Sequence, residues 1–197
     1  MPPLGGRCEA PPAGGASAEG VSAERLNALR YQKENLLIDK PITIQISENY
    51  AAISEKILKQ TAILRWGKLS RKRLVKGIDS MRRDPFGFVS FYVFALAGKK
   101  VVGFAYFAQG ENEPSQWWWG DLVVHPRHRR EGIAAQMLEQ GILMAKEKNA
   151  AKLITYIDYD NEASLAFHQK HAFVLSETQE PFNGFLVDGR AVYEREL

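Results

Sequence analysis

The sequence predicts an α/β (α+β) protein built on a mixed β-sheet. Two observations lead to this fold class. Short segments with alternating or continuous apolar residues predict strands, and between them lie longer segments whose apolar residues recur every three to four positions, as in helices. The predicted order is strand, two helices, three strands, helix, strand, helix and two strands. This order is typical of a layered fold in which helices cover a sheet.

The first elements follow from apolar spacing and from residues that begin or end helices. Residues 42–46 alternate apolar and polar side chains and predict a strand. A helix is predicted to begin within residues 47–49 and to end at Trp66-Gly67. A second helix follows Ser70, a good N-cap, and ends at Asp84-Pro85. Its many basic residues predict a solvated face, with partner binding as the alternative.

Three strands are predicted between Phe88 and Val124, the first two joined by a hairpin turn at residues 97–99. The third strand contains three consecutive tryptophans. Because side chains alternate across a strand, Trp117 and Trp119 share one face and Trp118 takes the other. We expect them to pack in the core and at its edge, with the alternative that at least one lines a substrate cleft.

Helices and strands alternate in the second half of the chain. A central helix is predicted from near Arg130 or Glu131 to about Asn149, followed by a buried strand over residues 152–158. A helix over residues 162–171 and two closing strands complete the fold.

Length and composition indicate one globular domain with an N-terminal extension. The chain has 197 residues, of which 45% are hydrophobic, enough for one sizeable core. Residues 1–21 are rich in Gly, Pro and Ala and predict a mobile tail. Residues 22–40 form an N-terminal arm in this scheme, and residues 41–197 form the globular domain.

Composition also excludes several classes of protein. The single cysteine, Cys8, excludes a disulfide framework, and no Cys/His cluster has the spacing of a zinc site, so we expect no metal. The formal net charge of +3 is too small to indicate a dedicated nucleic-acid-binding protein. No apolar run approaches the roughly 20 residues that span a bilayer, and the N-terminus does not look like a signal peptide. We therefore expect a cytoplasmic protein that binds neither nucleic acid nor membrane.

The strongest functional signal is a strand, a basic loop and a helix in succession. The apolar run 122–124 ends a strand, which His125-Pro126 terminates. The first turn of the following helix has N–H groups without partners inside the helix. Gly132 and the small Ala134 allow a ligand to approach this backbone, and the loop's arginines add positive charge. The join predicts a phosphate or pyrophosphate site.

This join resembles the first signature of the GNAT superfamily of N-acetyltransferases, Arg/Gln-x-x-Gly-x-Gly/Ala after a Val-x-Pro strand end. Here it stands as Arg129-Arg130-Glu131-Gly132-Ile133-Ala134 after Val124-His125-Pro126. A second segment resembles the superfamily's Asn-x-x-Ala-x-x-Phe-Tyr-x-Lys-x-Gly-Phe signature; it reads Asn161-x-x-Ser164-x-x-Phe167-His168-x-Lys170-x-Ala172-Phe173. With the element order, the resemblance covers about residues 41–197.

The resemblance implies a GNAT-like, mixed and mainly antiparallel central sheet with helices on both faces. It also implies an N-acetyltransferase that moves an acetyl group from acetyl-CoA, its cosubstrate, directly to a primary amine of a small molecule or protein. Residues 41–197 would then be an acetyl-CoA-dependent acetyltransferase domain. The cofactor-binding residues carried over by the resemblance are Leu122, Val123 and Val124 along the pantetheine arm, Arg129, Arg130, Glu131, Gly132, Ile133 and Ala134 around the pyrophosphate, and Asn161 and Ser164 on the next helix. The strands at 122–124 and 152–158 would splay apart around the thioester.

Acetyl transfer also needs a base for the amine, a donor to the thioester oxygen and an acid for the leaving thiolate. The N–H of Val123 or Val124 is the expected donor, and Asp121 is the expected base, with Asp158 and Glu111 as alternatives. His168 stands where the family has a tyrosine that protonates the thiolate. Histidine can donate a proton near neutral pH, so the role can survive there. The alternative is a histidine of the helix surface.

The acceptor is not identified by the sequence. The resemblance implies that the segment around Trp66–Arg83, the loop before the tryptophan strand and the C-terminal hairpin determine it. Five acidic residues favour a cationic acceptor: Glu111, Glu113, Asp121, Asp158 and Asp160. The alternative function is a non-catalytic acyl-CoA-binding regulatory module whose chemistry was lost at His168. A homodimer is left open.

Overall fold

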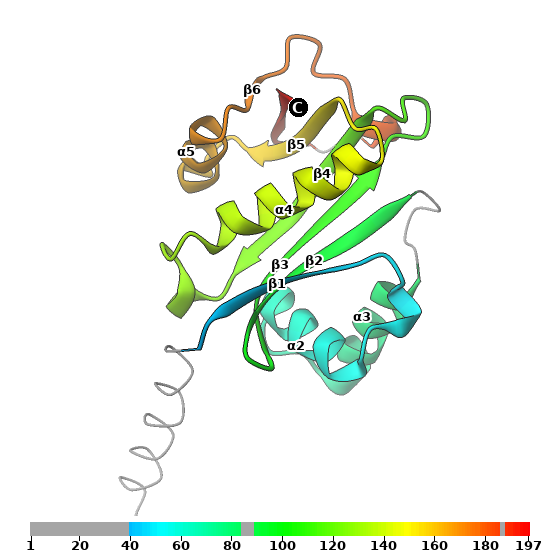
Figure 1. Ribbon diagram of the computed structural model, residues 1–197, viewed down its shortest axis with the longest axis vertical. Coiled ribbons are helices and arrows are strands. Elements are labelled where there is room, and N and C mark those ends of the chain that lie inside the picture. Colours follow the sequence, from blue (N-terminus) through cyan, green and yellow to red (C-terminus); the bar gives the residue numbers. More distant parts are fainter. Residues whose placement is uncertain (1–39, 84–88, 186–187) are drawn as a thin grey trace, which may run out of the picture. The chain divides into compact units, whose positions relative to one another are not determined.

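The computed structural model describes residues 40–83, 89–185 and 188–197, so the predicted tail and nearly all of the predicted arm lie outside the described residues. A seven-stranded sheet with the order β1-β2-β3-β4-β5-β7-β6 organises these residues (Figure 1). Only β4 and β5 pair in parallel, and the other neighbours are antiparallel. The mixed, mainly antiparallel sheet predicted from the sequence is therefore confirmed. The strands are β1 (Ile42–Ser47), β2 (Ser90–Ala97), β3 (Lys100–Gln109), β4 (Gln116–Val124), β5 (Lys152–Asp158), β6 (Val174–Leu175) and β7 (Arg190–Glu196).

Helices cover both faces of this sheet. The α-helices are α2 (Glu55–Trp66), α3 (Arg71–Arg82), α4 (Ile133–Glu147) and α5 (Glu162–Lys170), and short 3₁₀ turns are η1 (Tyr50–Ala52), η2 (Pro126–His128) and η3 (Phe182–Gly184). One buried cluster joins the sheet to α4, and a second joins its other face to α2 and α3. Trp117 and Trp119 are fully buried in the first cluster, whereas Trp118 packs on the second, as the alternation predicted. No helix in the described part of the chain is long and apolar enough to cross a bilayer.

Two helix starts differ from the prediction. Asn49 caps only the 3₁₀ turn η1, because Ile53 is extended and α2 begins afresh with Ser54 as its N-cap. The central helix α4 begins at Ile133 rather than near Arg130, because Arg130 and Gly132 both have positive φ. The loop before α4 is consequently longer than predicted, and its backbone is more available to a ligand.

The C-terminal half of β4 separates from β5. Parallel pairing joins the two strands only from Gln116 to Trp118. Beyond this point a β-bulge occurs in β4, where Asp121 and Leu122 together face the single residue Ala105 of β3. Asp121 has a φ of 55° in this bulge, which bends the strand away from its neighbour. The splay of the two strands opens the sheet beside the basic loop.

Candidate active site

The N-terminus of α4 differs from those of the other α-helices that the structure describes. A serine or asparagine side chain caps each of the other three: Ser54 on α2, Ser70 on α3 and Asn161 on α5. Gly132 at the start of α4 provides no such cap. A Cβ built on Gly132 would meet nothing closer than Gln136 Nε2 at 4.0 Å, so this side of the backbone is open. The first amides of α4 are thus left for an external acceptor of hydrogen bonds.

These amides face a cleft of about 420 Å³ between the loop and α5. Basic groups dominate its polar lining, since Arg129, Arg130 and Lys170 carry positive charge at neutral pH. The complete lining is Val124, His128, Arg129, Arg130, Gly132, Ile133, Ala134, Ala135, Phe167, Lys170 and His171. Open amides at the positive end of a helix, surrounded by cations, fit a pyrophosphate group.

Internal hydrogen bonds hold the basic loop in place. The Nε of Arg129 donates to the carbonyl oxygen of Val124 at 3.3 Å, which ties the loop to β4. Buried His128 contacts Glu131 through Nδ1 and Oε2 at 3.0 Å, so the carboxylate of Glu131 has a partner within the loop. Burial, and then the nearby charge of Lys100, lowers the pKa of His125. Its Nδ1 accepts a hydrogen bond from the N–H of Arg127 at 3.3 Å.

The register of β4 determines which amides face the splay. His125 N–H donates to Val102 O of β3 at 2.8 Å. Because backbone groups alternate along a strand, the Val123 N–H also points toward β3, whereas the N–H groups of Leu122 and Val124 point toward the gap. Of the two amides that the sequence nominated as thioester donors, Val124 is therefore the one directed at the gap.

A second pocket, of about 210 Å³, lies on the opposite side of β4. Arg65, Trp66, Ser80, Met81, Tyr92, Tyr106 and Asp121 line it, from α2, α3 and three strands. The guanidinium of Arg65 forms an ion pair with the Asp121 carboxylate. Its Cζ also lies over two aromatic rings, 4.5 Å from the ring centroid of Trp66 and 5.1 Å from that of Phe104. Cation–π contacts of this kind orient the guanidinium toward the bulge.

Two glycines allow aromatic rings to pack at and behind the wall of this second pocket. A Cβ on Gly77 of α3 would stand 2.5 Å from Cζ3 of Trp66, so the indole of α2 packs directly on the backbone of α3. A Cβ on Gly120 would stand 2.2 Å from Cζ2 of Trp118 in the same way. Trp118 also contacts Tyr106, with ring centroids 5.6 Å apart. The positions of the Trp66 and Trp118 rings therefore depend on close contact with the backbone of these two glycines.

The two pockets lie on opposite sides of the splayed end of β4. Val124 lines the basic cleft, and Asp121 lines the aromatic pocket three residues earlier on the same strand. At about 3.3 Å per residue, roughly 10 Å of strand separates them. An anionic ligand in one and a second molecule in the other would therefore approach each other across the gap.

Sequence and structure comparisons agree with this geometry. The model of the acetyltransferase (GNAT) family matches residues 58–173. The chain belongs to the GNAT acetyltransferase family. No curated protein matches it.

Solved structures share the GNAT fold at low sequence identity. An acetyltransferase from Streptococcus agalactiae 2603 has a TM-score of 0.62 and 14% identity, with 78% of this chain and 98% of that chain covered. The PaiA N-acetyltransferase from Thermoplasma acidophilum, in complex with coenzyme A, has a TM-score of 0.56 and 15% identity, with 79% and 99% covered. Ard1 from Thermoplasma volcanium has a TM-score of 0.55 and 17% identity, with 78% and 97% covered.

The residues of the second GNAT signature divide into two groups. Asn161 and Ser164 use their polar atoms within α5, since Asn161 Oδ1 accepts from Ser164 N at 3.1 Å and Ser164 Oγ lies 3.2 Å from His168 Nδ1. Neither lines the basic cleft. The cleft instead receives Phe167, Lys170 and His171, which the sequence did not nominate. Their spacing of three and four positions, which places them on one face of α5, was the signal available.

His168 is buried against the core. Its ring lies beside Trp119 and Phe173, with centroids 5.4 and 5.0 Å away. Nδ1 is 2.7 Å from the carbonyl oxygen of Ser164, so Nδ1 carries a proton that it donates there, and Nε2 has no partner in the described structure. Burial lowers the pKa of His168, although the bond to Ser164 opposes this. The ring is therefore neutral at neutral pH, with a bare Nε2.

Of the two alternative bases, Asp158 has a paired carboxylate, whereas Glu111 is bonded through its backbone. Asp158 Oδ1 accepts from Arg190 Nε at 2.5 Å. The N–H of Glu111 donates to Asn183 Oδ1 at 2.9 Å, which connects the β3–β4 loop to η3. Neither acidic residue lines either pocket.

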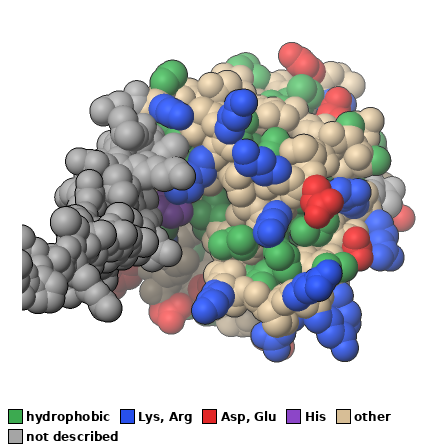
Figure 2. Space-filling model, turned by 90° about the horizontal axis from the view of Figure 1, so that it is seen from below, with side chains coloured by type: hydrophobic (Ala, Val, Ile, Leu, Met, Phe, Trp, Pro, Cys, Tyr) green, Lys and Arg blue, Asp and Glu red, His purple; other side chains and the backbone are tan. Residues whose placement is uncertain are grey.

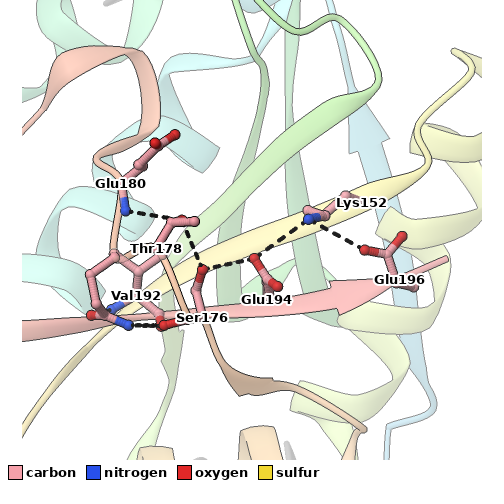
Figure 3. A network of polar contacts seen from close by, with 8 residues as sticks. Lys152, Ser176, Thr178, Glu180, Val192, Glu194 and Glu196 are labelled. Atoms are coloured by element: carbon pink, nitrogen blue, oxygen red, sulfur yellow. Dashed lines mark hydrogen bonds and ion pairs between the residues drawn. The ribbon is translucent and has the colours of Figure 1, made fainter.

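Polar contacts hold the C-terminal hairpin beside β5 (Figure 3). Ser176 Oγ donates to Glu194 at 2.9 Å, and Lys152 contacts both Glu194 and Glu196, at 3.5 and 3.4 Å (Figure 3). The amide of Gln179 completes the β6–β7 connection by bonding both backbone groups of Val192, at 3.1 and 2.9 Å. A fixed hairpin provides a rigid wall on this side of the molecule.

The next segment of the hairpin is anchored by Tyr156. Its hydroxyl accepts from Phe182 N at 2.6 Å and donates to Phe185 O at 3.1 Å. Burial raises the pKa of this phenol, so it stays protonated and continues to donate.

In the described residues no group of three or more His, Cys, Asp or Glu side chains is placed to hold a metal ion.

Proposed function

We propose that this GNAT protein transfers an acetyl group from acetyl-CoA to a primary amine of a small molecule or protein. The observation that carries the proposal is the uncapped N-terminus of α4 inside a basic cleft, beside the unpaired edge of β4. Acetyl-CoA supplies the acetyl group as a reactive thioester. The aromatic pocket on the other side of β4 supports the acceptor amine.

Backbone groups perform most of the cofactor binding in this proposal. The amide N–H groups of Gly132, Ile133 and Ala134 donate to the pyrophosphate oxygens, with Arg129 and Arg130 beside them. The gap-facing amides of Leu122 and Val124 pair with the pantetheine arm as a neighbouring strand would. The Val124 N–H is the proposed donor to the thioester oxygen. Asn161 and Ser164 contribute indirectly, by capping α5 and orienting His168.

Asp121 is the proposed base for the acceptor amine. Its carboxylate lines the aromatic pocket at the bulge, near the gap. Arg65 holds this carboxylate in position through the ion pair. A lone pair of Asp121 left beside that pair can take the proton that the amine releases, directly or through one water molecule.

His168 is the proposed acid for the leaving thiolate, with a restriction. Because Nδ1 already donates to Ser164, only Nε2 can receive and deliver a further proton. The lowered pKa makes this protonated form scarce above the usual pKa of histidine, about 6.5. The contribution of His168 should therefore increase as the pH falls.

The alternative function is a non-catalytic acyl-CoA-binding module. One observation favours it: both expected proton-transfer groups are engaged, Asp121 by Arg65 and His168 by Ser164. The two functions share the cofactor cleft and differ in turnover.

An amine panel separates the two functions. The full chain would be incubated with acetyl-CoA and with each of several primary amines, from small molecules to peptides, while release of CoA thiol is followed. Thiol release and acetylated product on at least one amine, with loss of both in Asp121→Asn, would support the transferase. Binding of acetyl-CoA without turnover on any amine would support the module.

A further inference from the structure

The charges of the chain are divided unevenly between the helical pair α2–α3 and the remaining sequence. From Ser54 to Arg83 there are ten lysines and arginines but only two acidic residues, Glu55 and Asp79. The remaining sequence therefore holds 16 of the 26 basic and 21 of the 23 acidic residues. The modest net charge of the whole chain thus conceals a strongly positive helical pair on a net negative remainder.

These positive charges lie on the surface. Nine of the ten basic side chains are exposed, namely all except that of Arg65. None of the nine forms an ion pair with another described residue. Figure 2 views the molecule from the side on which α2 and α3 lie, and Lys and Arg side chains outnumber Asp and Glu on this face. These nine charges are therefore held by no ion pair within the described chain.

A stripe of basic residues on α3 leads to the aromatic pocket. Ser80 lines the pocket, and Arg73, Lys76 and Arg83 lie at seven, four and three positions from it. At 3.6 residues per turn, Arg73, Lys76 and Ser80 share one face of α3, whereas Arg83 is the C-cap residue just beyond its end. Arg71, nine positions from Ser80, lies on the opposite side of the helix. The basic stripe therefore continues the pocket outward along α3.

The aromatic pocket itself offers no counter-charge to a cation. Asp121 is its one acidic lining residue, and Arg65 already pairs with it. A cationic acceptor would also have to approach through the positive surface of α2 and α3, which repels it. Of the five acidic residues on which the sequence favoured a cationic acceptor, Asp121 and Asp158 are paired with arginines, and the other three line neither pocket.

We propose that the acceptor is the amino terminus of an acidic peptide segment. Its terminal residue enters the aromatic pocket beside Ser80, and acidic side chains behind it contact Lys76 and Arg73. From residue 80 back to residue 73 the stripe extends roughly 10 Å, at about 1.5 Å per residue. An extended peptide covers this length with about three residues, whereas a small amine reaches only the pocket. The identity of the reaction rests on the proposed function, but binding of the peptide does not.

Peptide binding tests the proposal independently of turnover. The probes are ten-residue peptides with a free N-terminal alanine and a C-terminal fluorophore, with residues 2–6 acidic (Glu/Asp), neutral (Gln/Asn) or basic (Lys/Arg). Fluorescence anisotropy would be measured with the full chain and saturating CoA. The acidic peptide should bind at least about tenfold more tightly than the neutral one at low salt, and the advantage should shrink as salt screens it.

A matched pair of charge reversals locates the binding surface. Arg73→Glu and Arg71→Glu make the same charge change in the same first turn of α3, so both affect the helix dipole alike. Both side chains are exposed, so neither change should disturb the fold. Arg73→Glu should bring the ratio of the neutral peptide's Kd to the acidic peptide's Kd close to one. Arg71→Glu should leave this ratio within about twofold of wild type.

The remaining outcomes separate the acidic-peptide surface from the acetyltransferase activity. Tight binding of the acidic peptide without acetylation would support the acceptor surface and reject the transferase. Acetylation with equal or greater preference for the neutral or basic peptide would reject the inference and keep the transferase. An oligonucleotide of equal charge that binds as tightly as the acidic peptide, and is equally sensitive to Arg73→Glu, would also overturn the assignment to peptides.

Discussion

The two pockets on either side of β4 are built in different ways. The cleft beside α4 is formed largely by one continuous segment, residues 124–135, and its proposed ligand contacts are backbone amides placed by Gly132. The pocket beside α2 and α3 is formed by side chains of five elements, among them Arg65, Tyr92 and Asp121. A ligand bound by backbone can be inferred from a short motif, whereas a ligand bound by assembled side chains depends on the whole fold. Each of the following variants should alter function at one pocket, the cofactor cleft or the acceptor pocket, and leave the other unchanged.

The largest effect is expected for Asp121→Asn on the acceptor side. Removing the base should lower kcat by about 10²–10⁴, while acetyl-CoA affinity stays unchanged because the cleft is untouched. Asparagine tolerates the positive φ of this position, so the bulge should persist. Asp158→Asn is the matched control, because Asp158 also pairs with an arginine. If the control loses kcat and Asp121→Asn does not, the base has been assigned to the wrong strand.

Gly132→Glu should give the next largest effect, on the cofactor side. A carboxylate beside the pyrophosphate, with loss of a charge-assisted hydrogen bond of about 1.5–3 kcal/mol, predicts a fall in acetyl-CoA affinity of roughly 10- to 150-fold. Peptide binding at the acceptor surface should persist in the variant. Calorimetric titration of the folded variant would measure the affinity.

Gly132→Ala separates charge from backbone strain. It carries the same positive φ as Gly132→Glu, and the open space around the position accommodates its Cβ. Its acetyl-CoA affinity should stay within about tenfold of wild type. Equal loss in both variants would assign the effect to the strained backbone instead of to the pyrophosphate.

His168→Gln should have a smaller effect that depends on pH. Burial lowers the pKa of His168, so the acid form exists only as the pH falls below about 6.5. The ratio of wild-type to variant kcat should therefore be largest near pH 5.5, roughly tenfold, and approach one by pH 8. Taking the ratio cancels the titration of the acceptor amine, which both enzymes share. A ratio that stays constant from pH 5.5 to 8 would leave His168 with a packing role only.

Gly77→Ala should give the smallest effect. The added methyl group would displace the ring of Trp66, which stands 2.5 Å from the position of the new Cβ. We expect kcat/KM for the acceptor to fall a few-fold, with acetyl-CoA affinity unchanged. The helix itself gains up to about 1 kcal/mol from alanine in place of glycine. Unchanged acceptor kinetics would show that Trp66 does not shape the pocket.

The sequence predicted the fold and the family well for physical reasons, whereas its cofactor-binding residues stay a prediction. Alternating and helical apolar patterns gave every strand and α-helix in order, and the alternation of strand side chains placed Trp117 and Trp119 in one core. The family of the chain, read from the two motifs, is confirmed by the match to residues 58–173. Local signals therefore sufficed where a local segment forms the structure.

The acceptor side was not predictable because its contacts join distant residues. The pairing of Arg65 with Asp121 spans 56 positions, and no periodic pattern reports it. Packing of α2 against the bulge of β4 brings both to one pocket, so two of the five acidic residues that suggested a cationic acceptor, Asp121 and Asp158, are paired with arginines. The positive φ of Arg130 likewise follows from the loop as a whole and shifted the start of α4.

Stabilisation of the fold by acetyl-CoA shows whether the cleft beside α4 binds this cosubstrate. If the cleft beside α4 binds acetyl-CoA, mass action at 100 times the dissociation constant adds about 2.7 kcal/mol to the free energy of unfolding. For a chain of this length that corresponds to a rise in melting temperature of roughly 5–10 °C. We predict a rise in melting temperature that grows with acetyl-CoA concentration in wild type and in Asp121→Asn, and is lost in Gly132→Glu. A folded wild-type protein whose melting temperature does not change at millimolar acetyl-CoA would contradict it.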